Sequence, residues 1–498
     1  MQKLIEKILT VNNSETDRIL LLRADGTNSN TSYKFTIVYL CVLTPKWSGS
    51  IMAQIKKNIR YDTGMRNKKM KERYDAIIVG TGAAGLYCAL NLPEKMNILL
   101  ITKQEADQSD SFLAQGGICM LRGEEDYENY FEDTMRAGHY ENNKRAVDLM
   151  IRSSNDIIRD LLRYHVDFAR DGLGNLAFTR EGAHSQPRIL FHEDITGKEI
   201  TQSLLNTAKT RENIEICEYM TMVDLISKDN TVCGIIVMDQ NEQAIPVFSQ
   251  FVVLACGGIG GLFKNSTNFS HIAGDGLGIA MKHHVELEHL YYIQIHPTTL
   301  YSHKPGRRFL VSESVRGEGA LLYDKNGQRF TNELQPRDLL SQKIFEQMEK
   351  DGTEFVWEDM RPLGEKTIME HFPHIYEQCI EEGFDPRKEP IPVVPAQHYF
   401  MGGIKVNLGS KTSMKGLYAC GETSCNGVHG KNRLASNSLL ESLVFARKAA
   451  DDMIFGETPE YVKADDVDMK IYENREELLS GYHTAVLNEI ERMRMSHE

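Results

Sequence analysis

Long apolar runs are missing from this chain of 498 residues. The longest, Phe35 to Leu43, has about half the length that a membrane-spanning helix requires. The chain also lacks an opening series of basic, apolar and small residues of the kind that marks a secretory signal. We therefore expect a cytoplasmic protein that does not enter a membrane.

Cysteines with metal-ligand spacing are absent as well. The nine cysteines include no CxxC pair, and Cys420 and Cys425 match no common zinc spacing. Unpatterned cysteines in odd number are typical of free thiols in a reducing compartment. The sequence therefore predicts no metal site.

Positive charge is in deficit. The 57 lysines and arginines face 70 aspartates and glutamates, which gives a formal net charge of −13. This balance argues against nucleic acid or an anionic membrane surface as a partner. An acidic protein that binds a dianion must concentrate its cations locally. Arginines and histidines in glycine-rich loops are therefore the residues to examine.

A glycine-rich turn follows the apolar strand expected over Tyr74 to Val79. The turn consists of Gly80, Thr81, Gly82, Ala83, Ala84 and Gly85. A helix over 83–92 and a second strand over 96–101 should follow, as in a βαβ dinucleotide-binding unit. Gly80 permits the tight turn, Gly82 lets backbone approach a pyrophosphate, and Gly85 allows the helix to pack closely on the strand. The free N–H groups of the helix N-terminus suit the phosphates.

The acidic residue that usually binds a ribose at the end of the second strand is absent. Lys103 stands there, with Glu105 two positions later, which weakens the case for NAD and suits a flavoprotein with different adenosine contacts. Asp275, between two glycines, is suited to ribityl hydroxyls, although it could instead cap a helix. Further cofactor contacts are expected from Asp110, Ser111, Phe112, Leu113, Ala114, Gln115, Gly116, Gly117, Glu422, Ser438 and Leu439. Together these segments predict FAD.

Several motifs in a fixed order now point to a family. They are AQGGI (114–118), TREGAHS (179–185), HPT (296–298), SESVRGEGA (312–320), PRD (336–338), HYFMGGI (398–404) and GVHGKNRLASNSLLE (427–441). With them, most of the chain, Tyr74 to Ala446, resembles the fumarate reductase and succinate dehydrogenase flavoprotein superfamily. Within that superfamily it is most similar to the L-aspartate oxidase family.

The resemblance implies a site for a C4 dicarboxylate, whose two ends need cations and hydrogen-bond donors. Arg433 and His398 would hold one carboxylate, and His296 with Ser312 and Glu313 the other. Taken alone, the two histidines would be structural, but the HPT and HYFMGGI motifs around them favour substrate binding.

Arg337, in the PRD motif, matches the arginine that this superfamily uses as proton donor and acceptor. Its free pKa is above 12, so this role is unusual for an arginine. The alternatives are that Arg337 pairs with Asp338 or only binds substrate.

Two positions distinguish the subfamilies. Relatives with covalent FAD carry a histidine where this chain has Asp110, so the resemblance implies a non-covalent flavin. Glu181 occupies a place where aspartate oxidases have a carboxylate beside the substrate ammonium, and succinate-oxidising relatives have a neutral side chain. The alternative for Glu181 is a surface glutamate beside Arg180.

The implied reaction is FAD-dependent oxidation of L-aspartate to iminoaspartate, with reoxidation by dioxygen, which gives hydrogen peroxide, or by fumarate. In the family this is the first step of NAD synthesis through quinolinate, with possible handover of the product to quinolinate synthase. The alternatives are a soluble fumarate reductase or succinate-oxidising flavoprotein and, more remotely, a flavin-binding protein without catalysis. We expect a monomer or weak homo-oligomer.

The predicted fold class is α/β, with a Rossmann-like FAD-binding domain, an inserted α+β capping domain and a short helical C-terminal tail. The expected boundaries are a poorly ordered extension over 1–73, an FAD-binding domain over 74–290 and 397–455, a capping domain over 291–396 and a truncated tail over 456–498. The elements expected in the FAD-binding domain include one strand over 215–225, and a further helix should open near Ser436.

Overall fold

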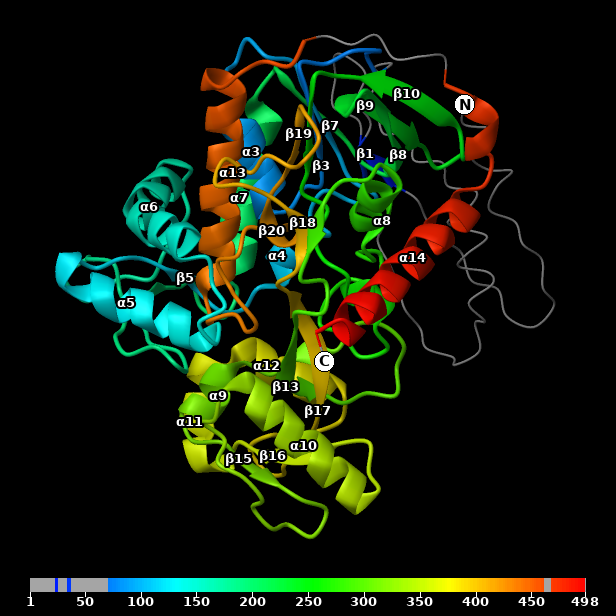
Figure 1. Cartoon of the computed structure of the whole chain (residues 1–498). Coiled ribbons are helices and arrows are strands. Elements are labelled where there is room, and N and C mark those ends of the chain that lie inside the picture. The colour runs from blue at the N-terminus through cyan, green and yellow to red at the C-terminus, as the bar shows by residue number, and fades with distance from the viewer. Residues whose placement is uncertain (1–22, 26–33, 37–69, 461–466, 498) are drawn as a thin grey trace. The chain divides into compact units, whose positions relative to one another are not determined.

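The computed structural model describes residues 23–25, 34–36, 70–460 and 467–497 (Figure 1). The chain divides into two units, Met1–Met70 and Lys71–Glu498. In the first unit, β1 (Arg23–Asp25) pairs with β2 (Lys34–Thr36) in antiparallel register. The expectation of a poorly ordered extension over 1–73 falls almost entirely on residues outside the described ranges.

A central parallel sheet organises the second unit, with the strand order β19-β11-β3-β4-β7. Its strands are β3 (Ala76–Val79), β4 (Ile98–Ile101), β7 (Ile214–Cys217), β11 (Phe251–Leu254) and β19 (Leu417–Ala419). Every residue of β3, β4 and β11 is apolar and buried, as expected for a sheet covered on both faces. Val79 lies beside both Ile101 and Leu254. These strands therefore end level, and the loops that follow them meet at one edge.

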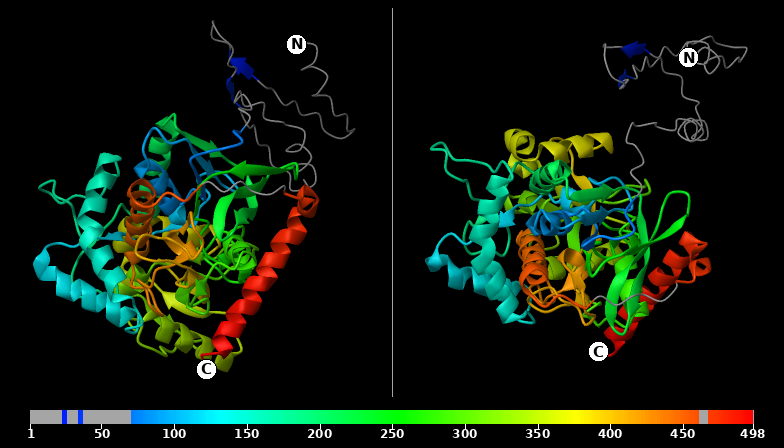
Figure 2. Two further views of the ribbon diagram at one scale, coloured as in Figure 1. Left: turned by 45° about the horizontal axis from the view of Figure 1, so that its top comes forward. Right: turned by 90° about the horizontal axis from the view of Figure 1, so that it is seen from above.

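Helices and a second sheet cover the central sheet (Figures 1 and 2). The helix α3 (Ala83–Asn91) packs against α7 (Thr196–Thr210) and α13 (Asn437–Phe455). Next to α13 lies α6 (Lys144–Arg163), which in turn contacts α5 (Glu124–Ala137). An antiparallel sheet contacts β11 through its middle strand, and its members are β8 (Thr221–Lys228), β9 (Thr231–Met238) and β10 (Ala244–Phe248).

The strand predicted over 215–225 is wrong as a single element. The chain there forms β7 and β8, which belong to different sheets. Between them Tyr219 adopts a φ of 59°, a left-handed conformation that a continuous strand does not contain. Apolar residues occur on both sides of this bend, so their distribution along the chain gave no sign of it.

A second layer has its own antiparallel sheet and apolar core, shown in green and yellow in Figure 1. The sheet has the order β14-β13-β17-β16-β15, with β13 (Ile293–Leu300), β14 (Phe309–Leu310), β15 (Leu321–Tyr323), β16 (Val356–Asp359) and β17 (Ile391–Phe400). Its helices are α9 (Glu313–Gly317), α10 (Arg337–Asp351), α11 (Glu365–His371) and α12 (Pro373–Glu381). The α/β class with an inserted α+β domain is thus confirmed, and the expected domain boundaries stay predictions.

The remaining helices and strands complete the described part. They are α4 (Asp110–Leu113), α8 (Asp275–Lys282), α14 (Arg475–Met495), β5 (Ile118–Cys119), β6 (Ile189–Leu190), β12 (Leu287–Glu288), β18 (Gly403–Lys405), β20 (Ser424–Cys425), η1 (Gly260–Leu262), η2 (Arg361–Leu363), η3 (Gly421–Thr423) and η4 (Met469–Tyr472). None of the described helices has both the length and the apolar character needed to cross a membrane. Within the same residues, no group of histidine, cysteine and acidic side chains could hold a metal ion.

Candidate active site

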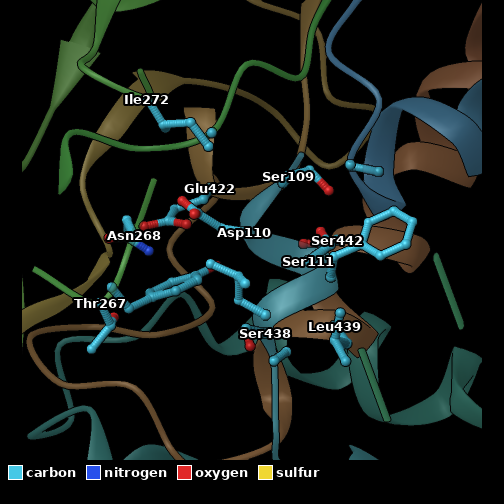
Figure 3. A pocket seen from close by; sticks show the side chains of 18 of the residues that line it. Ser109, Asp110, Ser111, Thr267, Asn268, Ile272, Glu422, Ser438, Leu439 and Ser442 are labelled. Carbon is cyan, nitrogen blue, oxygen red and sulfur yellow. The ribbon is translucent and has the colours of Figure 1, made fainter. Parts of the chain in front are cut away.

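A cavity of about 370 Å³ lies where the loops after β3, β4, β11 and β19 meet, and Figure 3 shows part of its lining. It brings together residues expected to bind cofactor and residues expected to bind substrate. The predicted residues that line it are Gly80, Thr81, Gly82, Ala84, Lys103, Asp110, Ser111, Phe112, Leu113, Ala114, Gln115, Gly116, Gly117, Glu181, Asp275, His296, Ser312, Glu313, Arg337, His398, Glu422, Arg433, Ser438 and Leu439. Only Ala83 and Gly85, among the predicted residues, do not line it.

The glycine-rich turn is shaped by close backbone contacts. Gly80 has a φ of 118°, and a Cβ there would lie 2.1 Å from the carbonyl oxygen of Ala255, so only glycine fits without a shift. A Cβ at Gly85 would lie 2.0 Å from the carbonyl oxygen of Gly80. Gly85 therefore serves helix packing, whereas Gly80 and Gly82 border the cavity. The first N–H group of α3, that of Ala83, donates to the hydroxyl of Ser111 at 3.1 Å. The positive end of the helix dipole lies at this loop, which suits a pyrophosphate.

Lys103 and Asp275 form an ion pair at the end of the cavity that follows β4. Lys103 also donates to the carbonyl oxygen of His271 at 2.7 Å. The Nε2 of His483 lies 2.8 Å from the Asp275 carboxylate. Burial raises the pKa of Asp275, but hydrogen bonds and charges from His483 and Lys103 outweigh it and hold that pKa below its ordinary value. Gly274 is the N-cap of α8, so the helix-capping alternative for Asp275 is wrong.

Two half-buried carboxyl groups lie close together in the lining of the cavity, as Figure 3 shows for Asp110 and Glu422. Burial raises the pKa of Asp110 to about 7, and burial together with the Asp110 charge raises that of Glu422 to about 8. Each accepts one backbone hydrogen bond at 2.9 Å, Asp110 from Phe269 and Glu422 from Phe400. The second oxygen of Asp110 is buried without a partner in the described part of the chain. Such groups suit the hydroxyls and ring edge of a flavin.

The start of α13 supplies the opposite wall of this region. Ser436 is the N-cap residue with a φ of 60°, a left-handed conformation that is uncommon outside glycine. Ser438 and Leu439 follow in the first turn and line the cavity. The helix dipole places partial positive charge here. Together with the glycine turn and the partner-free oxygen of Asp110, this wall fits FAD.

Two neutral histidines stand side by side at the other end of the cavity. The rings of His296 and His398 are 5.3 Å apart. Burial and the charge of Arg337 hold the pKa of His296 well below its ordinary value, and burial with Arg433 does the same for His398. The Nε2 of His296 is buried without a partner among the described residues. Nδ1 of His398 lies 2.8 Å from the Thr267 hydroxyl, so the neutral ring can accept there and donate from Nε2 to a bound carboxylate. Nδ1 of His296 lies 2.9 Å from the carbonyl oxygen of Thr298, which can only accept, so the neutral ring carries its proton on Nδ1 and offers Nε2 as an acceptor.

Arg433 is 5% exposed and lies with its guanidinium 4.6 Å from the ring centre of Tyr399. Its Nη1 donates to the hydroxyl of Ser438 at 3.2 Å. Burial, with help from the Arg337 charge, lowers the pKa of Arg433 to about 10. The group is therefore still a cation at neutral pH. A buried cation held by stacking is a ready partner for a carboxylate.

Arg337 begins α10 and is held by two partners. Its Nε contacts the Glu313 carboxylate at 2.6 Å, and its Nη1 donates to the side-chain oxygen of Gln294 at 3.0 Å. Asp338 instead lies 3.2 Å from His139. The alternative in which Arg337 pairs with Asp338 is therefore wrong. Ser312 borders the cavity as the N-cap of α9, where it accepts from the Ser314 N–H.

Glu181 belongs to the cavity and is not a surface residue beside Arg180. Its Oε2 accepts from the hydroxyl of Ser436 at 2.7 Å. Burial, and then the nearby Glu313 charge, raise its pKa, while Ser436 and the two arginines of the site oppose this. A carboxylate thus shares the cavity with Arg337 and Arg433.

Three contributing residues were not predicted from the sequence. The Thr267 hydroxyl lies 2.8 Å from Nδ1 of His398, and the Ser436 hydroxyl donates to Glu181. Arg316 is a buried cation. Together with Arg337 it holds the pKa of Glu313 below its ordinary value, against the effect of burial. Arg316 lies three residues after Glu313, a helical spacing that could have revealed it. Thr267 has no local signal, because β17 brings its partner from 131 residues away.

Comparison with known proteins gives the family. The FAD binding domain family matches residues 75–439. An L-aspartate oxidase of Clostridium perfringens is 50% identical over 382 residues, covering 76% of this chain and 87% of the relative. An L-aspartate oxidase of Clostridium acetobutylicum is 46% identical over 385 residues, covering 77% and 88%.

Solved structures show the same fold. A chain of the E. coli quinol fumarate reductase superposes with a TM-score of 0.74 at 30% identity, covering 84% of this chain and 74% of the other. A chain of the Mycobacterium smegmatis Sdh1 complex gives a TM-score of 0.69 at 30% identity, covering 79% and 70%.

Proposed function

Because the chain belongs to the L-aspartate oxidase family of FAD-dependent oxidoreductases, we propose that it oxidises L-aspartate to iminoaspartate. The substrate loses two electrons and two protons in this reaction. FAD, when bound, supplies the two-electron acceptor, and dioxygen or fumarate would restore it. The same reaction would supply the first intermediate of NAD synthesis through quinolinate.

FAD would lie at the end of the cavity that the glycine turn, Lys103, Asp275 and the start of α13 line. The N-terminus of α3 and the turn at Gly80 suit its pyrophosphate, and Asp275 with Lys103 suits its hydroxyls. The first turn of α13 lines the cavity, and its dipole would favour the negative charge of a reduced cofactor. Asp110 occupies the position of the linking histidine in covalent relatives, and a carboxylate cannot form that link. The cofactor is therefore non-covalent.

Two cationic clamps support a dicarboxylate substrate. Arg433 with the neutral His398 would hold one carboxylate, and His296, Ser312 and the Arg337 region the other. Clamping both ends fixes the Cα between them in one orientation. Positioning of this kind accounts for a large part of many enzymatic rate enhancements.

Arg337 is proposed to move the proton. Its contact with Glu313 at 2.6 Å gives the proton a carboxylate partner, and Gln294 fixes the guanidinium plane. Arg316 keeps Glu313 ionised, so that Glu313 holds Arg337 in place. The second proposed role of Arg337, binding of substrate, is compatible with the same geometry.

The observation that favours aspartate over succinate is the position of Glu181. A carboxylate inside a cavity with two arginines would repel a dianion, but it attracts an ammonium group on the same molecule. The hydroxyl of Ser436 orients it at 2.7 Å. L-Aspartate alone among these C4 substrates carries that ammonium group.

Anaerobic reduction of the flavin tests this proposal. L-Aspartate should bleach the flavin absorbance of the purified holoenzyme, and succinate should do so far more slowly. Glu181→Gln keeps the size of the side chain and should raise KM for L-aspartate by roughly tenfold, since one charge-assisted contact is lost. Arg180→Gln, next in the chain and outside the cavity lining, serves as the matched control. Faster bleaching by succinate would favour a soluble fumarate reductase or succinate-oxidising enzyme, and a flavin that neither compound bleaches would favour a non-catalytic flavoprotein.

The proposed setting follows from this reaction. Iminoaspartate is unstable in water, so direct handover to quinolinate synthase would protect it. Location in the cytoplasm and a monomeric or weakly associated state are part of the same proposal.

A further inference from the structure

The C-terminal helix α14 lies directly on α8, the helix whose first residue borders the cofactor cavity (Figure 1). A Cβ at Gly278 of α8 would lie 2.4 Å from the Cβ of Tyr482, so this glycine allows the two helix backbones to approach closely. The Tyr482 hydroxyl donates to the carbonyl oxygen of Val223 at 2.9 Å, and Val486 is fully buried. These contacts hold α14 against α8.

A separate contact anchors the segment before α14. The Tyr472 hydroxyl donates to the Asp224 carboxylate at 2.7 Å. The same carboxylate contacts Lys282, the last residue of α8, and His283, its C-cap. Removal of one side chain from α14 would therefore leave the helix in place.

In this position α14 contacts a residue of the cofactor cavity through the side chain of His483. The Nε2 of His483 lies 2.8 Å from one carboxylate oxygen of Asp275, which is 6% exposed. Lys103 contacts the other oxygen. Both Asp275 and Lys103 line the cavity, whereas His483 does not. His483 thus stands one contact away from the cofactor.

We propose that α14 is part of the FAD site, with His483 a positioning residue that fixes the Asp275 carboxylate for the hydroxyls of the cofactor. Between Lys103 and His483 the carboxylate cannot rotate. Without His483, Asp275 would turn toward Lys103 and lose the orientation that FAD requires. The inference rests on FAD binding and does not depend on the identity of the substrate.

The coupling between FAD binding and the docking of α14 on α8 must act in both directions. If docking of α14 strengthens FAD binding, then FAD binding strengthens the docking of α14 by the same factor. FAD should therefore slow amide exchange along Arg475–Met495 in the full chain, although those backbone amides do not border the cavity.

Flavin affinity of the apoprotein tests the proposal without any amino-acid substrate. His483→Ala should weaken FAD binding roughly tenfold, the loss expected for one hydrogen bond to a charged group. His483→Gln, which can still donate to Asp275, should restore most of that affinity. Thr484→Ala, at the exposed neighbouring position of α14, should bind FAD as the original chain does.

Amide exchange and thermal unfolding of the apoproteins separate positioning from stability. FAD should protect α14 in the original chain and in Thr484→Ala, and much less in His483→Ala. An unchanged FAD affinity in His483→Ala overturns the proposal. The proposal is also overturned if His483→Ala lowers the FAD affinity and the thermal stability of the apoprotein by equal free energies and His483→Gln does not restore the affinity. His483 would then only support the fold.

Discussion

Replacement of Glu313 by glutamine perturbs the proton-handling arginine at a single atom. The 2.6 Å contact between Glu313 and Nε of Arg337 would change from an ion pair to a hydrogen bond with a neutral amide. Hydrogen bonds to charged groups contribute about 1.5–3 kcal/mol, and neutral ones about half as much. The difference, about 0.8–1.5 kcal/mol, corresponds to a fall in kcat of roughly four- to thirteenfold.

The fall should appear in kcat more than in KM, because the substitution leaves the proposed substrate contacts of Arg433 and the two histidines in place. Steady-state oxidation of L-aspartate and stopped-flow flavin reduction without oxygen would both measure it. Flavin content should stay that of the original enzyme, since Glu313 lies at the substrate end of the cavity.

Glu318→Gln is the matched control. Glu318 follows the same helix, α9, and its carboxylate contacts only the exposed ring of His371 among the described residues. Equal turnover of the Glu313→Gln and Glu318→Gln variants would refute the proposed support of Arg337 by Glu313. A rise in KM with kcat unchanged would do so as well, because it would limit Glu313 to substrate binding.

Two further perturbations test other parts of the site. KM for L-aspartate should rise as pH falls through the raised pKa of Glu181, since the protonated carboxyl no longer attracts the ammonium group. Glu181→Gln should flatten this pH dependence. The same pH profile of KM in that variant would contradict the role of Glu181. Gly80→Ala forces a Cβ to 2.1 Å from a carbonyl oxygen at a φ of 118°, a strain on the order of 1–3 kcal/mol or more. Loss of bound FAD and a lower Tm are expected, whereas Gly172→Ala, in open space, should change neither; full FAD loading of Gly80→Ala would show that the loop can shift.

The sequence predicts the parts of this site that depend on local chemistry. A strand, a turn that only glycine permits at Gly80, and a helix at Ala83 follow from neighbouring residues, and the structure confirms all three. The gathering of the motif residues in one cavity was also foreseeable, because loops at the carboxyl ends of parallel strands meet. The roles assigned to Glu181, Arg337 and the histidines stay predictions.

Contacts between distant segments were not predictable in the same way. No apolar pattern is interrupted at the bend at Tyr219. Thr267 contacts His398 only because the fold brings the loop that carries Thr267 beside β17. The contact of His483 with Asp275 joins residues 208 apart in the chain. Neither periodicity nor composition encodes such a meeting, which arises from the packing of α14 on α8.

The strand order of the central sheet has a consequence for biosynthesis. β3 leaves the ribosome well before β11, which becomes its neighbour, and β19 closes the sheet last. The contact between Glu181 and Ser436 spans 255 residues, so nearly the whole chain must emerge before the pocket can assemble. Until then β3 and β4 expose apolar faces and unpaired edges, which invite aggregation. We expect high-level expression to depend on chaperones and on flavin supply late in translation.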